Sequence, residues 1–139
     1  MNRVLLTLVL TVFSGSLFLS SPTSAQFVPS ARKTAHIRII KGPELELARE
    51  NLTIIRWTTN NPGGSPDHFG VVHYGKDPKD LSQTAKSHIR LNQGHSYTVF
   101  RVRVEGLAPK TTYYYKVDSG DARGASDGVT SGIKTFMTP

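Results

Sequence analysis

Strict two-residue alternation of apolar and polar side chains is the feature that most limits how this 139-residue chain can fold. Residues 97–104, with the sequence YTVFRVRV, place apolar groups at every second position and arginines between them. Successive residues of a β-strand point to opposite faces of a sheet, so this run predicts a strand with one buried and one exposed face. A helix would spread the same apolar groups around its surface, because its side chains repeat every ~3.6 residues.

β-rich runs recur along the chain and are separated by turn residues at the spacing typical of a β-sandwich. Gly42-Pro43 is expected to end the first strand, and the Gly-, Asp- and Ser-rich residues 119–127 are expected to form a loop. Residues 44–51 have some helical propensity, but the stretch is short. We therefore predict an all-β fold, a seven-stranded antiparallel β-sandwich with strands at residues 37–40, 52–59, 68–75, 81–91, 97–104, 111–118 and 129–138.

The N-terminus has the pattern of a secretory signal peptide over residues 1–25. Arg3 precedes an apolar stretch, and the small residues Thr23, Ser24 and Ala25 offer a cleavage site before Gln26. The alternative, an uncleaved anchor, needs about 20 continuous apolar residues, and the stretch is broken by polar residues. We expect a leader or linker at 26–35, a domain at 36–139, secretion or a periplasmic location, and no stable membrane anchor after cleavage.

The composition excludes several classes of protein. The chain contains no cysteine, so it has no disulfide scaffold, no thiolate zinc site and no cysteine nucleophile. Its 37% of apolar residues can build the core of one domain of ordinary size. The net charge of +7 is the one property of the composition that hints at partners.

The segment around Leu107 carries the most specific pattern in the chain. Pro109 fixes a turn, Thr111 starts a strand, and the hydroxyl of Tyr113 can reach back to the backbone of the turn, as in the corner of sandwich domains. Together with an inward-facing Trp57, this pattern resembles a fibronectin type III domain, which is an immunoglobulin-like sandwich.

Four pieces in order extend this resemblance. The pieces are similar to the fibronectin-like N-terminal domain of purple acid phosphatases, and they are residues 57–59, 72–75 (which include Tyr74), 107–115 and 136–139. The resemblance covers about residues 36–139. In that family a separate C-terminal domain binds two metal ions, and its motifs do not occur before Pro139. The resemblance therefore brings no catalytic residue, metal ligand or cofactor to this sequence.

The five histidines raise the possibility of a metal site. They show no short ligand pair, and only two share a predicted strand, where their spacing turns them to opposite faces of the sheet. We expect ordinary surface histidines; the alternative is that three of them converge with Asp67 or Asp77. The residues are His36, His68, His73, His88 and His95.

Four arginines are expected on one exposed face of the sheet that the first, second and fifth strands share. They are Arg38, Arg56, Arg101 and Arg103, and Glu105 is the nearest acid. The first interpretation is a solvated face that discourages edge pairing. The second is a contact with a polyanion, such as an acidic polysaccharide or an envelope phosphate, because guanidinium groups match such anions. We expect no nucleic acid, because alternation leaves only Tyr114 of the three adjacent tyrosines as a free ring.

The resemblance implies an accessory role. We expect a secreted, non-catalytic module for binding or protein–protein interaction, whose partner is a metallophosphatase or another exported protein. The alternative is a truncated or trans-acting part of a metal-dependent acid phosphatase. A purely structural envelope component is a third class, because a sandwich fold does not by itself define a function.

Overall fold

The computed structural model describes residues 32–49 and 52–139 as an assembly of eight strands. The predicted signal peptide and the first part of the predicted leader lie outside the described residues. No helix occurs within the described ranges, so they contain no helix that could cross a membrane. The strands are β1 (Ile39–Arg49), β2 (Leu52–Asn60), β3 (Asp67–Gly75), β4 (Gln83–Arg90), β5 (Tyr97–Val104), β6 (Thr112–Asp121), β7 (Ser126–Thr130) and β8 (Lys134–Met137).

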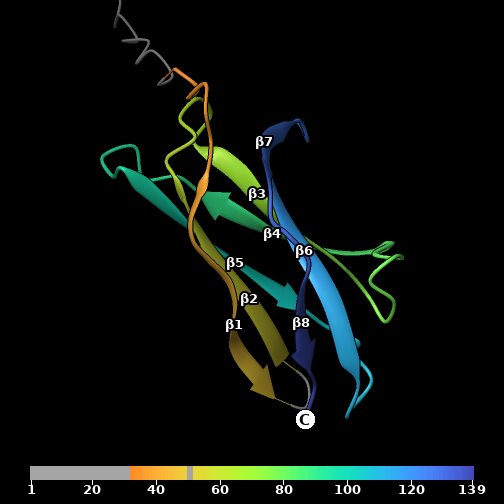
Figure 1. Ribbon diagram of the computed structural model, residues 1–139. Helices are drawn as coiled ribbons and strands as arrows, with labels where there is room; N and C mark the ends of the chain where they lie inside the picture. Colours follow the sequence, from red (N-terminus) through yellow and green to blue (C-terminus); the bar gives the residue numbers. More distant parts are fainter. Residues whose placement is uncertain (1–31, 50–51) are drawn as a thin grey trace, which may run out of the picture.

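The strands form two antiparallel sheets that face each other (Figure 1). One sheet has the order β1-β2-β5, and the other has the order β4-β3-β6-β7, with β8 also paired to β6. The predicted all-β sandwich is confirmed, as is the sharing of one sheet by the first, second and fifth strands. There are eight strands rather than seven because residues 131–133 interrupt the last one, and both halves pair with β6.

The prediction that Gly42-Pro43 ends the first strand is wrong. Strand β1 continues to Arg49, and Glu44 lies opposite Arg56 of β2. The register shifts between Lys41 and Glu44, where Gly42 has a φ of 81°. Glycine accepts this left-handed backbone, so the irregularity is absorbed without loss of the pairing further along.

The expected loop at residues 119–127 is also shorter than predicted. Strand β6 runs on to Asp121, and β7 begins at Ser126. The Asp121 carboxylate accepts hydrogen bonds from the backbone N–H groups of Arg123 and Ala125, at 2.9 and 3.1 Å. These bonds close a tight turn between β6 and β7. The polar residues that predicted a long loop therefore form the end of a hairpin.

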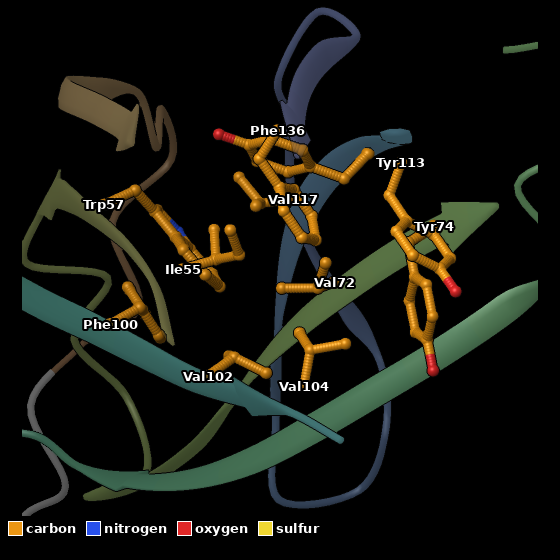
Figure 2. Packing of buried hydrophobic residues seen from close by; sticks show 11 residues of the cluster. Ile55, Trp57, Val72, Tyr74, Phe100, Val102, Val104, Tyr113, Val117 and Phe136 are labelled. Atoms are coloured by element: carbon orange, nitrogen blue, oxygen red, sulfur yellow. The ribbon is translucent and has the colours of Figure 1, made fainter. Parts of the chain in front are cut away.

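The core fills the space between the sheets (Figure 2). Trp57 is 1% exposed and stacks on Phe100, with ring centroids 5.2 Å apart. Gly70 faces these rings from β3, where a Cβ would lie 2.9 Å from the Trp57 ring, so only glycine leaves them room. Burial, helped by the charge of Glu44, raises the pKa of Tyr115 to about 12, and this phenol therefore stays neutral at physiological pH.

The corner predicted at residues 107–113 is present. The backbone N–H of Ala108 donates a 3.0 Å hydrogen bond to the hydroxyl oxygen of Tyr113, whose ring is buried against Tyr74 and Phe136. Leu107 packs against the core, and the Thr111 hydroxyl donates to the carbonyl of Pro109. The sequence signature that predicted the fold is therefore a set of packed and hydrogen-bonded residues.

Candidate binding site at the loop end of the sandwich

The end of the sandwich opposite the C-terminus collects the N-terminal segment and three connections (Figure 1). These are the β2–β3 loop, the β4–β5 loop and the β6–β7 turn. A pocket of about 500 Å³ lies between the β2–β3 loop and the β6–β7 turn, a size that can hold a small ligand. It is lined by Lys33, Gly63, Gly64, Ser65, Pro66, His68, Asp121, Ala122 and Arg123.

A buried histidine, His68, lines this pocket and pairs with a buried aspartate behind it, Asp127. His68 is completely buried, and its Nδ1 lies 2.9 Å from Oδ2 of Asp127, whose side chain is 0% exposed. The other ring nitrogen, Nε2, lies 3.3 Å from the carbonyl oxygen of Gly63. Both ring nitrogens therefore lie within hydrogen-bonding distance of an oxygen atom, and the ring is held in one orientation.

Lys33, which precedes β1, adds a cation to the His68–Asp127 pair. Its Nζ lies 2.9 Å from Oδ1 of Asp127, and its side chain is 41% exposed. Next to it, the Thr34 N–H donates to the carbonyl of Pro62 at 2.7 Å, and the Thr34 hydroxyl donates to the carbonyl of Asn61 at 2.9 Å. The last residues of the segment expected to be a leader are therefore hydrogen-bonded to the β2–β3 loop.

Asp121 supplies a carboxylate to the lining of the pocket. Burial acts to raise its pKa, but the N–H groups of Ala125 and Arg123 and the Arg123 guanidinium, 3.4 Å away, lower it more. The pKa of Asp121 is therefore held below its usual value of 3.8, and the group is ionised at neutral pH. Most of its acceptor capacity is used within its own turn.

The pocket is suited to holding a polar ligand rather than to acid–base chemistry. A general base must reach the proton that it abstracts, and both ring nitrogens of His68 are buried and engaged. Lys33 and Arg123 are the exposed cations of the lining. Within residues 32–49 and 52–139 no group of three His, Asp or Glu side chains converges as metal ligands would.

The expectation that all the histidines lie on the surface is wrong for His68. His36, His88 and His95 are exposed, and His73 is half-buried on the opposite face of β3 from His68. The signal for His68 was its position, because it shares the face of Gly70, Val72 and Tyr74. The pairing with Asp127 was not visible, because 59 residues separate the two.

On the predicted arginine face, the positive charges of three arginines are paired with glutamates. Arg56 lies directly opposite Arg101 in the β2–β5 pairing, and Arg103 follows on the same face. Each has a carboxylate partner: Arg56 with Glu44 at 3.4 Å, Arg101 with Glu46 at 2.8 Å, and Arg103 with Glu105 at 2.6 Å. Two of these acids lie on the part of β1 that the sequence interpretation missed. Arg38 lies apart, just before β1.

These features define the class of protein first. Two packed antiparallel sheets, an inward Trp57 and the Tyr113 corner make a fibronectin type III-like β-sandwich. The family model described as "Purple acid Phosphatase, N-terminal domain" matches residues 41–138. The chain therefore belongs to the family of purple acid phosphatase N-terminal domains.

The match covers most of the described part of the chain, from residue 41 to residue 138. The resemblance drawn from residues 107–113, Trp57 and Tyr74 is confirmed as a family assignment.

The chain was also compared with solved structures and with curated protein sequences. Among solved structures, the chain is similar to the sensor domain of the anti-sigma factor RsgI4 in Pseudobacteroides cellulosolvens, with 19% identity and a TM-score of 0.46. The alignment covers 74% of this chain and 87% of that one. No curated protein sequence matches the chain.

Proposed function

We propose that this domain is a non-catalytic binding module that works outside the cytoplasm, with a metallophosphatase or another exported protein as its partner. The observation that carries the proposal is the family match over residues 41–138, because the family is named for a domain that accompanies a phosphatase. The domain has a hydrophobic core of its own, so it can present binding surfaces without help from a partner.

The loop-end pocket supports this role. Binding sites are commonly built from loops that a rigid scaffold positions, and here the buried His68–Asp127 pair ties the strands that flank the pocket. Lys33 and Arg123 can bind a polar or charged group of a ligand. The engaged histidine supplies no free base, which favours binding over turnover.

Phosphatase assays and binding assays test this proposal together. We expect the purified chain to give no hydrolysis of p-nitrophenyl phosphate with iron, zinc or manganese, beyond that of the metal alone. We expect it to bind a purified metallophosphatase of the same host, measured by isothermal titration calorimetry. Metal-dependent hydrolysis by the chain alone would contradict the proposal, as would heat-stable binding that survives unfolding of the domain.

The second candidate is a trans-acting or truncated part of a metal-dependent acid phosphatase. The same family match favours it, because the printed residues hold one of the two domains that such an enzyme combines. The two candidates differ in one measurable quantity. A trans-acting part raises the kcat of a separately added metallophosphatase domain. A simple binding module binds that domain and leaves its kcat unchanged.

A location outside the cytoplasm is the other part of the proposal. It rests on Arg3, the apolar stretch after it and the small residues that end at Ala25. Mass spectrometry of the protein from periplasmic and medium fractions is expected to find an N-terminus at Gln26. An intact Met1 retained in the membrane fraction would refute cleavage.

A polyanion contact at the arginine face stays a proposal as well. The observation that favours it is the register, which sets Arg56 opposite Arg101 on a solvent-facing sheet. An acidic polysaccharide would have to displace the paired glutamates. Retention on heparin-agarose is expected to fall in Arg101→Ala/Arg103→Ala and to hold in Lys76→Ala/Lys79→Ala, which removes the same charge from the β3–β4 loop. Equal retention of both variants would end the proposal.

A further inference from the structure

A groove runs along the side of the sandwich where the edges of the two sheets face each other. Its volume is about 520 Å³, and its walls come from the start of β1 and from β7 with the residues that follow it. Ile37 and Ile39 contribute apolar surface from one wall, and Val129 contributes it from the other. This hollow is separate from the loop-end pocket, with which it shares no lining residue.

Both walls are strands with one side unpaired in the described part of the chain. Strand β1 pairs with β2, and β7 and β8 pair with β6, so each of them is an outer strand of its sheet. Such edges are where proteins commonly accept an extended segment of another chain. The register shifts of β1 between Ile39 and Lys41 and between Lys41 and Glu44 break the regular ladder, so side chains must carry much of the recognition.

The charges of the groove are unbalanced. Arg38 and Lys134 line it, and no acidic residue does. Neither cation has an ion-pair partner within residues 32–49 and 52–139, in contrast to Arg56, Arg101 and Arg103 of the neighbouring face. Two unmatched cations along one groove favour an occupant that brings carboxylates.

Apolar side chains accompany these cations. Ile40, next to the groove residue Ile39, and Ile133, next to the groove residue Lys134, are each 51% exposed. These exposed aliphatic groups add apolar surface beside the apolar residues that line the groove, Ile37, Ile39 and Val129. The occupant should therefore combine acidic side chains with apolar ones.

We propose that the groove between β1 and β7 binds an extended acidic segment of a partner protein. Carboxylates of the segment pair with Arg38 and Lys134, and an apolar side chain between them packs on Ile37 and Ile39 of the groove wall. The inference rests on the proposed function in one respect, that the domain acts by binding another protein. It adds which surface binds and what chemistry the partner presents.

A peptide titration on the full chain tests the groove. The probe is a fluorescent decapeptide that alternates aspartate and valine, and fluorescence anisotropy measures its affinity. We expect Arg38→Glu/Lys134→Glu to weaken binding by about tenfold or more, because it turns two attractions into repulsions. The control variant Lys76→Glu/Arg90→Glu makes the same charge change away from the groove and should keep the affinity within about twofold.

Two further probes separate charge from shape. A decapeptide with asparagine in place of aspartate should bind about tenfold more weakly, and one with lysine should not bind. Equal binding of the lysine peptide, unchanged affinity in Arg38→Glu/Lys134→Glu, or no binding of the aspartate peptide at millimolar concentration would each overturn the inference. Light scattering that finds a dimer lost in the groove variant would also overturn it, since a second copy would then be the occupant.

The same variants keep this inference distinct from the proposed function. If Arg38→Glu/Lys134→Glu still binds the metallophosphatase with unchanged affinity, the groove is not the docking surface, while the binding role stands. If neither variant nor wild type binds a metallophosphatase but the aspartate peptide binds in the groove, the metallophosphatase is the wrong partner and the groove inference stands.

Discussion

The two ends of the sandwich are held together in different ways. At the corner end, the Tyr113 hydroxyl accepts a hydrogen bond from Ala108, five residues away in the chain. At the loop end, His68 pairs with Asp127 across 59 residues, and Thr34 bonds to Asn61 across 27. The Tyr113 bond joins neighbours in sequence, although Thr138 also bonds Ala108 and Thr111 at this end across 30 and 27 residues. The His68–Asp127 pair joins neighbours in space only, so the comparison teaches that the two ends differ in how much of their hydrogen bonding is local.

The largest effect is expected from removing Asp127. Asp127→Ala leaves His68 buried without its carboxylate and Lys33 without its partner, and breaking a buried pair in this way costs about 3–5 kcal/mol. Urea unfolding followed by circular dichroism measures the loss. The matched control is Asp67→Ala, which breaks the exposed pair with His88 and should cost no more than about 1 kcal/mol. Equal losses would remove the distinction between the buried and the exposed pair.

A second prediction concerns how the N-terminal segment is docked. Gly63 has a φ of 63°, and a Cβ there would collide with the carbonyl oxygen of Arg32. Gly63→Ala should cost about 2 kcal/mol, from left-handed strain together with this collision, and speed hydrogen exchange at the Thr34 amide. Gly124→Ala is the matched control, because Gly124 also has a positive φ but nothing lies within 4 Å of its Cβ position. It should cost about 1 kcal/mol and leave the Thr34 exchange unchanged.

The corner end should respond less strongly. Tyr113→Phe removes the acceptor of the Ala108 N–H and should lower the free energy of unfolding by about 1 kcal/mol. Tyr114→Phe, one residue along on the opposite face of β6, should change it by less than about 0.5 kcal/mol. Thermal and urea unfolding measure both. A loss at Tyr113 as large as that at Asp127 would mean that the local corner holds the fold as strongly as the distant pair.

The smallest effect is a pH dependence at the loop end. Because the folded-state pKa of Asp121 lies below its usual value of 3.8, the unfolded chain takes up that proton first as the pH falls. The stability that the carboxylate contributes is therefore present above pH 3.8 and lost as the pH drops through the lower folded value. Asp121→Asn should flatten the fall of Tm between about pH 4 and pH 2, measured by differential scanning calorimetry. An equally steep fall in the variant would place the titration elsewhere.

Much of the fold could be predicted because its signals are local. Alternation predicted β5 at residues 97–104 with the bounds that the structure has, and it predicted β2 to within one residue. The corner at Tyr113 could be predicted because turn, strand start and hydroxyl all lie within seven residues. These features depend on backbone preferences and on the two faces of a strand, both of which a short segment already defines.

The errors arose where a distant strand overrides a local signal. Gly42-Pro43 predicts a strand end, yet pairing with β2 carries β1 on to Arg49. This error also affected the prediction for the arginine face, because the missed part of β1 brings Glu44 to Arg56 and Glu46 to Arg101. Residues 119–127 predicted a loop, yet pairing with β3 and β7 extends β6 to Asp121.

The sequence by itself determined the all-β class, the Trp57 core position, the Tyr113 corner and the family to which the chain belongs. Each of these follows from a pattern of side chains within a short segment of the chain. Only the tertiary structure decided that His68 is buried against Asp127, that Arg56 and Arg101 have glutamate partners on β1, and that Arg38 and Lys134 face an open groove. The physical reason is that burial and charge pairing depend on which strands lie side by side, and that arrangement is a property of the packed sheets.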